Sequence, residues 1–185
     1  MELTQEQRDA VCGRNIALIG FMGAGKTTIS AALRDALGLT EAETDAVIVE
    51  KEGMPITQIF AEKGEPYFRA VETETVKALQ EQTGLVISCG GGVAMRQENV
   101  DALRTGSRIV LLTAQPQTIL ARIGDSTDRP LLNGHMNVEY IAELMEVRRP
   151  KYEAAADITI ATDGKSASQI VGEIVNTILE QEDIT

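Results

Sequence analysis

Residues 20–27 read Gly20-Phe21-Met22-Gly23-Ala24-Gly25-Lys26-Thr27. They match the pattern G-x-x-x-x-G-K-[ST] at every fixed position, with a strand-like apolar run at 15–20 before them and a helical pattern at 26–37 after them. Glycines let such a loop curl until successive backbone N–H groups point at phosphate oxygens, and the helix start adds positive charge. We therefore expect a nucleoside triphosphate site, in which Lys26 contacts the β- and γ-phosphates and the Thr27 hydroxyl binds Mg²⁺.

Outward from this loop, short apolar runs alternate with helical patterns, which is typical of an α/β protein with a mostly parallel sheet. Strands are predicted at 15–20, 41–44, 85–89, 108–112 and 158–160. Helices are predicted at 26–37, 45–52, 55–63, 65–82, 97–105, 116–123, 138–155 and 167–182. The pattern indicates one three-layer domain over residues 1–185, with five parallel strands, helices on both faces, and a core of about 15–178.

Three parts of this organisation depart from the regular pattern. The segment 41–44 stands where the second strand belongs, although its residues are poor strand formers. The segment 124–133 is polar and rich in turn formers, which predicts a flexible loop. The acidic end at 180–185 is expected to fray.

Composition excludes several classes of function. The chain carries 28 Asp and Glu against 17 Lys and Arg, a formal charge of −11, so its surface repels nucleic acids and anionic membranes. No apolar run approaches the ~20 residues of a transmembrane helix, and the polar N-terminus is unlike a signal peptide. The two cysteines, Cys12 and Cys89, show no pairing pattern. We expect a cytoplasmic monomer without nucleic acid or membrane partners.

Asp45 and Arg69 are candidates for binding a second, phosphate-accepting molecule. Asp45 follows the second predicted strand, at the sheet edge where open α/β proteins bind ligands, and its carboxylate suits a substrate hydroxyl. The alternative is that Asp45 caps the helix that begins there. Arg69 falls one turn into a helix, where a cation is disfavoured unless an anion is bound beside it. The alternative is a solvated surface arginine.

The remaining candidates are a glycine run and two arginine positions. Gly90, Gly91 and Gly92 follow a buried-type strand, which favours close contact between a ligand and the backbone over a plain tight turn. Arg129 lies in the polar loop, from which it could close over the transferring phosphates. Arg148 and Arg149 are adjacent on one helix and face different directions, so at most one is expected to enter a site.

Together these segments resemble the shikimate kinase family over about residues 15–178. The matching pieces are GFMGAGKTT at 20–28, TD at 44–45, GEPYFR at 64–69, SCGGG at 88–92, DRPLL at 128–132 and LMEVRRPKY at 144–152. The resemblance implies a P-loop kinase related to nucleoside monophosphate kinases. It would have a substrate-binding region at about 45–75 and a mobile lid at about 123–135.

The same resemblance implies a role for each candidate residue. Asp45 would hold the hydroxyls of shikimate and assist deprotonation of the attacking one. Arg69 and Arg148 would grip the carboxylate, and the glycines Gly90, Gly91 and Gly92 would contact the substrate through their backbone. Arg129 would reach the ATP phosphates from the lid. The cofactor-binding set would be Gly23, Ala24, Gly25, Lys26, Thr27, Thr28, Arg122 and Arg129.

Two positions depart from the family pattern. Glu43 stands where an Asp that helps to hold Mg²⁺ is usual, so Thr27 and Glu43 are the expected metal ligands. Ala167 stands where a Pro usually packs against adenine opposite the position of Arg122.

The resemblance implies direct in-line transfer of the γ-phosphoryl group from MgATP to shikimate, in the biosynthesis of aromatic amino acids, with Lys26, Asp45 and Arg129 in the catalytic roles. Two alternatives stay open at this point. One is a related kinase for gluconate or a nucleotide, and the other is a nucleotide-binding regulatory module without turnover.

Overall fold

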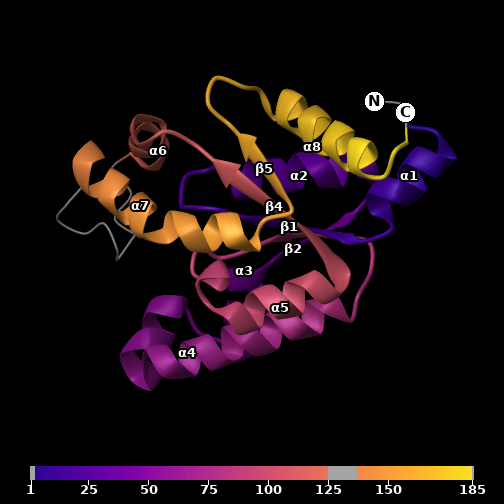
Figure 1. The fold of residues 1–185 in the computed structure, drawn as a ribbon. Helices are drawn as coiled ribbons and strands as arrows, with labels where there is room; N and C mark the ends of the chain where they lie inside the picture. Colours follow the sequence, from indigo (N-terminus) through magenta and orange to yellow (C-terminus); the bar gives the residue numbers. More distant parts are fainter. Residues whose placement is uncertain (1–2, 125–136, 185) are drawn as a thin grey trace.

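A five-stranded parallel sheet forms the centre of the computed structural model, which describes residues 3–124 and 137–184. The strand order is β2-β3-β1-β4-β5, and every pair is parallel (Figure 1). The strands are β1 (Asn15–Ile19), β2 (Thr40–Glu43), β3 (Leu85–Ser88), β4 (Ser107–Thr113) and β5 (Ile158–Ala161). All carboxyl ends therefore meet at one edge of the sheet, which is the edge where ligands bind in this architecture.

The helices cover both faces of the sheet (Figure 1). They are α1 (Gln5–Cys12), α2 (Lys26–Leu37), α3 (Thr44–Glu52), α4 (Ile56–Gln80), the 3₁₀ turn η1 (Val93–Met95), α5 (Gln97–Gly106), α6 (Pro116–Ile123), α7 (Val138–Ala155) and α8 (Ala167–Gln181). The predicted α/β class, five parallel strands and flanking helices are confirmed.

The central strand β1 is apolar from Ile16 to Ile19, and its burial shows why. Ile16 and Leu18 pack into the core beneath α2 and α8, whereas Ala17 and Ile19 pack into the opposite core beneath α4 and α5. All five residues of β1 are buried. A strand that is covered on both faces has no solvent side on which polar residues would be favoured.

The edge strand β2 has the unlikely sequence Thr-Glu-Ala-Glu. It pairs with β3 in register from Thr40 opposite Leu85 to Glu43 opposite Ser88. Only one of its edges is paired and its residues are at most half-buried, so its carboxylates stay in contact with solvent. The weak strand predicted at 41–44 is therefore present, beginning one residue earlier.

Several local features differ from the sequence prediction. The helix α1 and the turn η1 were not predicted. The helices predicted at 55–63 and 65–82 join at Gly64, whose φ of 80° and ψ of 167° break the helix within α4. The expectation that residues 180–185 fray is wrong for Glu182 and Ile184, because Glu182 pairs with Arg108 and Ile184 packs against the core.

Two further predictions concern membrane crossing and the lid. Within the described residues, no helix combines the length and the apolarity that crossing a bilayer requires. The predicted lid at about 123–135 lies almost wholly outside the described residues, and so does Arg129.

Candidate functional site

The loop between β1 and α2 is shaped by left-handed glycines. Gly23 and Gly25 have φ values of 75° and 101°, a region that residues with a Cβ rarely adopt. Gly25 is the N-cap of α2, and no side chain caps the first turn of that helix. A helix start without a side-chain cap suits an anion, which its first backbone N–H groups can bind.

Lys26 lies inside the curl of this loop. Its Nζ donates to the carbonyl oxygens of Gly20 at 2.9 Å and Phe21 at 3.1 Å. These bonds fold the long side chain back over the loop, so the ammonium group lies within the hollow that the glycines form. This arrangement puts a point charge where the terminal phosphates of a nucleotide would lie.

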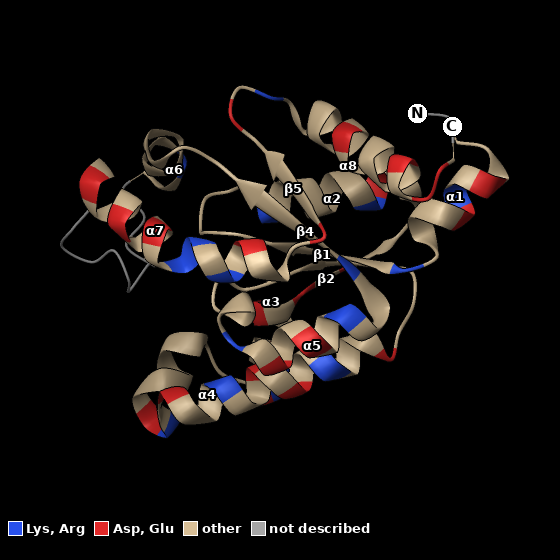
Figure 2. Ribbon diagram, in the orientation of Figure 1, with Lys and Arg blue, Asp and Glu red and all other residues tan. Residues whose placement is uncertain are grey.

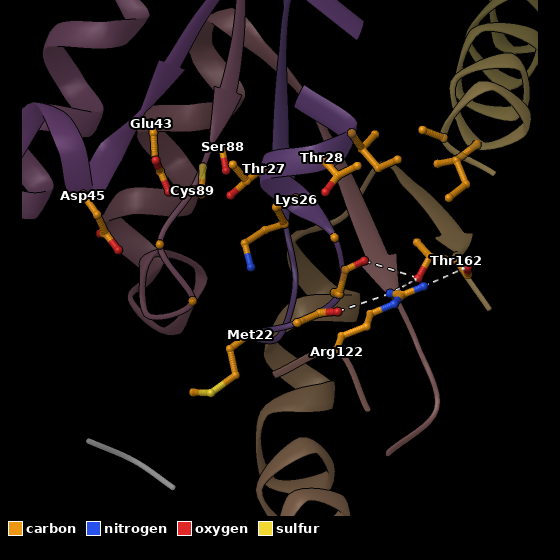
Figure 3. Close-up of a pocket in the computed structure, with 18 of the residues that line it drawn as sticks. Met22, Lys26, Thr27, Thr28, Glu43, Asp45, Ser88, Cys89, Arg122 and Thr162 are labelled. Carbon is orange, nitrogen blue, oxygen red and sulfur yellow. Dashed lines mark hydrogen bonds between the residues drawn. The ribbon is translucent and has the colours of Figure 1, made fainter. Parts of the chain in front are cut away.

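A cavity of about 530 Å³ runs along the carboxyl edge of the sheet. At one end it reaches Asp45, Gly90 and Gly91, and at the other end Arg122 and Ala167. Figure 3 shows Lys26 between Asp45 and Arg122 in this view. The other predicted residues that line it are Gly23, Ala24, Gly25, Thr27, Thr28 and Glu43. The cavity thus joins the phosphate loop to Asp45 and the glycine turn.

The glycine turn after β3 lies against both Asp45, which lines the cavity, and Arg69, which does not. A Cβ on Gly90 would lie 2.5 Å from Oδ1 of Asp45, and a Cβ on Gly92 would lie 2.4 Å from Nη1 of Arg69. Neither glycine has a positive φ, so a missing side chain rather than an unusual backbone is what these positions require. The carboxylate and the guanidinium lie against successive parts of one turn.

Hydrogen bonds inside the protein hold the same turn. The N–H of Gly90 donates to Oγ1 of Thr44 at 2.8 Å, and the Gly90 carbonyl accepts from the N–H of Val93. These bonds anchor the turn to the start of α3, next to Asp45. The N–H of Gly90 is therefore engaged by a side chain of the protein, a use that the sequence did not reveal.

The middle glycine lies beside α7. A Cβ on Gly91 would be 3.9 Å from Nη1 of Arg148 and 3.8 Å from the hydroxyl of Tyr152, which are ordinary contact distances. Arg148 also stacks over the ring of Phe21, with Cζ 5.8 Å from the centroid. Arg149 turns away and pairs with Glu146 at the surface. Of the two arginines, Arg148 lies against the glycine turn and Arg149 lies at the surface, and neither lines the cavity itself.

Arg69 has two protein carboxylates beside it. Its Nη1 donates to both oxygens of Glu72, at 3.0 and 3.1 Å, and its Nε and Nη2 donate to Glu65 at 3.2 Å. Glu72 is only 1% exposed, and burial raises the pKa of its carboxyl group, although Arg69 opposes this shift. These ion pairs with Glu65 and Glu72 hold the Arg69 guanidinium in place. Sequence reasoning missed Glu72, although its spacing of three residues from Arg69 was a usable signal.

Comparison with known proteins identifies the family. The profile described as Shikimate kinase matches residues 22–179 of this chain. The chain belongs to the shikimate kinase family. Its activity is accordingly that of a shikimate kinase, an ATP-using phosphotransferase of the shikimate pathway of aromatic amino acid biosynthesis. The resemblance inferred from the sequence is confirmed.

Individual shikimate kinases match nearly the whole chain. The enzyme of Dehalococcoides mccartyi strain 195 is 44% identical over 168 residues, which are 91% of this chain and 95% of that protein. The enzyme of Moorella thermoacetica is 44% identical over 160 residues, 86% of this chain and 91% of that protein.

Solved structures of shikimate kinases agree with this fold. The Acinetobacter baumannii enzyme, in complex with shikimate, has a TM-score of 0.85 at 32% identity and covers 91% of this chain and 94% of its own. A gluconokinase from Sinorhizobium meliloti has a TM-score of 0.61 at 17% identity, which reflects a shared fold alone.

In this shikimate kinase fold, Arg122 ties α6 to the phosphate loop. Its Nη1 donates to the carbonyl of Gly23 at 3.2 Å and to Oγ1 of Thr162 at 2.9 Å, and its Nη2 donates to the carbonyl of Thr162 at 3.2 Å (Figure 3). The Thr162 hydroxyl, which is 1% exposed, also lies 3.2 Å from the carbonyl of Ala24. These contacts set the plane of the guanidinium at the nucleotide end.

Several residues of the cavity were missed by sequence reasoning. Thr162 and Lys165 come from the loop after β5, Ile170 from α8, and Ser88 and Cys89 from the end of β3. Ser88 and Cys89 belong to the segment SCGGG at 88–92, but no role was predicted for them. Thr162, Lys165 and Ile170 belong to no recognisable motif and reach the cavity only through the parallel alignment of the strands. Burial raises the pKa of the Cys89 thiol to about 12, so this cysteine is present as a neutral thiol.

Proposed function

We propose that this chain transfers the γ-phosphoryl group of MgATP to a hydroxyl group of shikimate, giving shikimate 3-phosphate and ADP. One observation carries the proposal. The cavity that contains Lys26 also reaches Asp45, and the adjoining glycine turn lies against Asp45, Arg69 and Arg148. A carboxylate that can bind a substrate hydroxyl, and two guanidinium groups that can bind a substrate carboxylate, thus lie beside a phosphate-binding loop. The family of the chain is that of the shikimate kinases.

On the acceptor side, Asp45 accepts a hydrogen bond from the attacking hydroxyl and takes its proton as the bond to phosphorus forms. Arg69 and Arg148 bind the carboxylate of shikimate, and Gly90, Gly91 and Gly92 allow the substrate to approach the backbone. The glycine geometry supports this assignment, since side chains at 90 and 92 would displace Asp45 and Arg69. Holding the hydroxyl in line with the phosphorus provides much of the rate enhancement.

On the donor side, the phosphates of ATP are held by the loop at 23–25, through its backbone, and by Thr28, through its backbone and hydroxyl groups. Lys26 neutralises charge that develops on the γ-phosphoryl group. Arg122 stacks on the adenine ring across from Ala167, which would leave a less complete wall than a proline ring. Arg129, which lies outside the described residues, completes the charge neutralisation from the lid.

Thr27 and Glu43 suit a magnesium ion. Both line the cavity near the phosphate loop, and a hydroxyl with a carboxylate is the hard oxygen donor set that Mg²⁺ prefers. Among the described residues, no group of three or more acidic, His or Cys side chains could hold a metal alone, which suits a metal whose other ligands are phosphate and water. When bound there, the metal supplies positive charge to the phosphate oxygens.

A coupled assay of ADP release tests the proposal. With MgATP present, ADP release should depend on added shikimate and should be absent with gluconate or with nucleoside monophosphates. Turnover of either alternative acceptor in place of shikimate would identify a different kinase. Tight ATP binding without any turnover would identify a regulatory module.

Two variants test the residue roles. Lys26→Ala should nearly abolish turnover, since charge on the transferring group is then left unbalanced. Asp45→Asn should leave ATP binding unchanged and reduce kcat by about 100-fold or more, in line with the contribution of a general base. Wild-type turnover in either variant would refute the role given to that residue.

We further propose that the enzyme acts as a cytoplasmic monomer. Sedimentation would measure its oligomeric state, and cell fractionation would measure its location.

A further inference from the structure

Tyr152 lies behind the glycine turn, and the proposed mechanism leaves it without a role. Its side chain is on α7, one helical turn after Arg148, and the residue is only 5% exposed. The ring packs into the core formed by the strands with α4 and α5. Its hydroxyl donates to the carbonyl oxygen of Gly91 at 2.7 Å. A rigid buried ring therefore presents one hydrogen-bond donor to the middle of the turn.

The same carbonyl is within reach of Arg148. Nη1 of Arg148 lies 3.5 Å from the Gly91 oxygen, at the outer limit of a hydrogen bond. A guanidinium is a stronger donor than a phenol toward a carbonyl, since its hydrogen bonds are charge-assisted. If the phenol did not hold this oxygen, Arg148 would be the nearest donor and would close the gap.

We propose that Tyr152 is a positioning residue whose hydroxyl occupies the Gly91 carbonyl, so that Arg148 stays available for the carboxylate of the acceptor. The inference rests on the proposed function, because it assigns Arg148 to an acid. In this proposal Tyr152 touches neither substrate. It acts through the backbone of the glycine turn and the guanidinium of Arg148, which do.

The bond also orients the turn itself. The carbonyl of Gly91 and the N–H of Gly92 belong to one planar peptide unit and point in opposite directions. Fixing the carbonyl toward α7 fixes that N–H away from it. Gly91 itself has no side chain that could pack and resist rotation, so the anchor must come from outside the turn.

The phenol is suited to act as a permanent donor. Burial raises the pKa of the Tyr152 hydroxyl, although Arg148 opposes the shift. The hydroxyl thus stays protonated throughout the neutral and mildly alkaline range. The Gly91 carbonyl is half-buried, and without the phenol its nearest side-chain donor would be Nη1 of Arg148 at 3.5 Å.

The test removes one oxygen atom by Tyr152→Phe and compares two acceptors, shikimate and its methyl ester. The variant should raise the KM for shikimate about tenfold, the worth of one hydrogen bond to a charged group, while the KM for ATP stays within about twofold. The KM for the methyl ester, which has no carboxylate to bind Arg148, should change less than about twofold. Calorimetric titration of shikimate should show the same loss of affinity without turnover.

A double variant and a control complete the design. In an Arg148→Ala background, adding Tyr152→Phe should cause a much smaller loss toward shikimate than it causes alone, since its main effect passes through Arg148. Tyr67→Phe deletes a hydroxyl that pairs with Glu52 at the surface, and it should leave all constants unchanged. The KM for ATP serves as the check that Tyr152→Phe has folded.

Three results would overturn the inference. Equal losses toward shikimate and its methyl ester would show that the hydroxyl does not act through the carboxylate. Additive losses in the double variant would show that it does not act through Arg148, and unchanged constants would show that it does not act at all. A wild-type protein that leaves shikimate unphosphorylated would instead refute the proposed function, and the inference with it.

Discussion

At Gly90 the missing side chain leaves room for a carboxylate, and at Gly92 it leaves room for a guanidinium. The nearest atoms to an added Cβ are Oδ1 of Asp45 at 2.5 Å and Nη1 of Arg69 at 2.4 Å. Both are at the ends of flexible side chains, so an alanine would move the functional group and leave the backbone in place. Two glycines of one turn thus leave space for two different functional groups, the carboxylate of Asp45 and the guanidinium of Arg69.

Alanine at these positions should separate the two groups kinetically. Gly90→Ala should lower kcat about 100-fold, since a displacement of about 1 Å at the reacting group is sufficient for such a loss. Gly92→Ala should mainly raise the KM for shikimate, because Arg69 is proposed to bind the carboxylate. Steady-state kinetics with both substrates varied measures the split, and each variant is the control for the other. The same change in both parameters for both variants would contradict the assignment.

Cys89 offers a second residue-scale prediction, because it lines the cavity but is buried. Burial raises the pKa of its thiol to about 12, so almost no reactive thiolate exists at pH 8. Iodoacetamide at that pH should leave Cys89 unmodified in the native protein and should modify it after unfolding in urea. Mass spectrometry of the peptides reports each site, with the half-buried Cys12 as the internal comparison. Native modification of Cys89 as fast as that of Cys12 would contradict the prediction.

At the scale of elements, α4 depends on a break at Gly64. The φ of 80° with ψ of 167° is a region almost confined to glycine, and it redirects the chain just before the turn that carries Arg69. An added Cβ would find only Cδ of Pro66, at 3.7 Å, so space is not the constraint. The backbone angle alone demands glycine here.

Gly64→Ala should therefore destabilise the protein by about 1–3 kcal/mol, the usual cost of a residue held in such a region. Urea unfolding measures the change. Gly172→Ala in the middle of α8 is the matched control, because an added Cβ there meets nothing within 4 Å. It should stabilise the protein by about 0.5–1 kcal/mol through the gain in helix propensity. A loss of stability in both variants would show that the backbone angle is not the cause.

At the scale of the whole molecule, Arg108 joins the two ends of the chain. It lies at the start of β4, is 7% exposed, and donates to the carbonyl of Ala10 in α1 at 3.0 Å. It also pairs with Glu182 just after α8. The pair holds α1 and the C-terminal segment against the amino end of β4, and Figure 1 shows the two ends of the chain side by side.

Arg108→Met should lower stability by about 0.5–1.5 kcal/mol, because the half-buried carbonyl of Ala10 loses its donor, and it should leave the kinetic constants of both substrates unchanged. Thermal unfolding and steady-state kinetics on the same preparation measure the two effects. Lys77→Met removes the exposed pair with Glu98 and should leave stability unchanged. A changed KM in Arg108→Met would show that the far edge is coupled to the site.

The net negative charge of the whole molecule makes local cations important for binding an anionic acceptor. The formal charge is −11, and acidic side chains are spread over most helices (Figure 2). An anionic acceptor therefore approaches against the overall field. Basic residues gather in α7 after its acidic first turns (Figure 2). Arg148, which lies against the glycine turn, is one of these residues.

The sequence by itself determined the class of fold and most of the element boundaries. Continuous apolar runs such as the one in β1 predict strands that are covered on both faces, because a two-sided burial leaves no polar positions. The phosphate loop was readable because its glycines, Lys26 and Thr27 are adjacent in the chain and serve one ligand. The ordered motifs then indicated the family.

Only the tertiary structure decided which side chains share a space. Thr162 beside Arg122 and Tyr152 beside Gly91 are separated from their partners by 40 and 61 residues. The strand β2 likewise forms through its hydrogen bonds to β3, against the preference of its own residues. Contacts of this kind depend on where parallel strands end in space, and local sequence patterns contain no information on that distance.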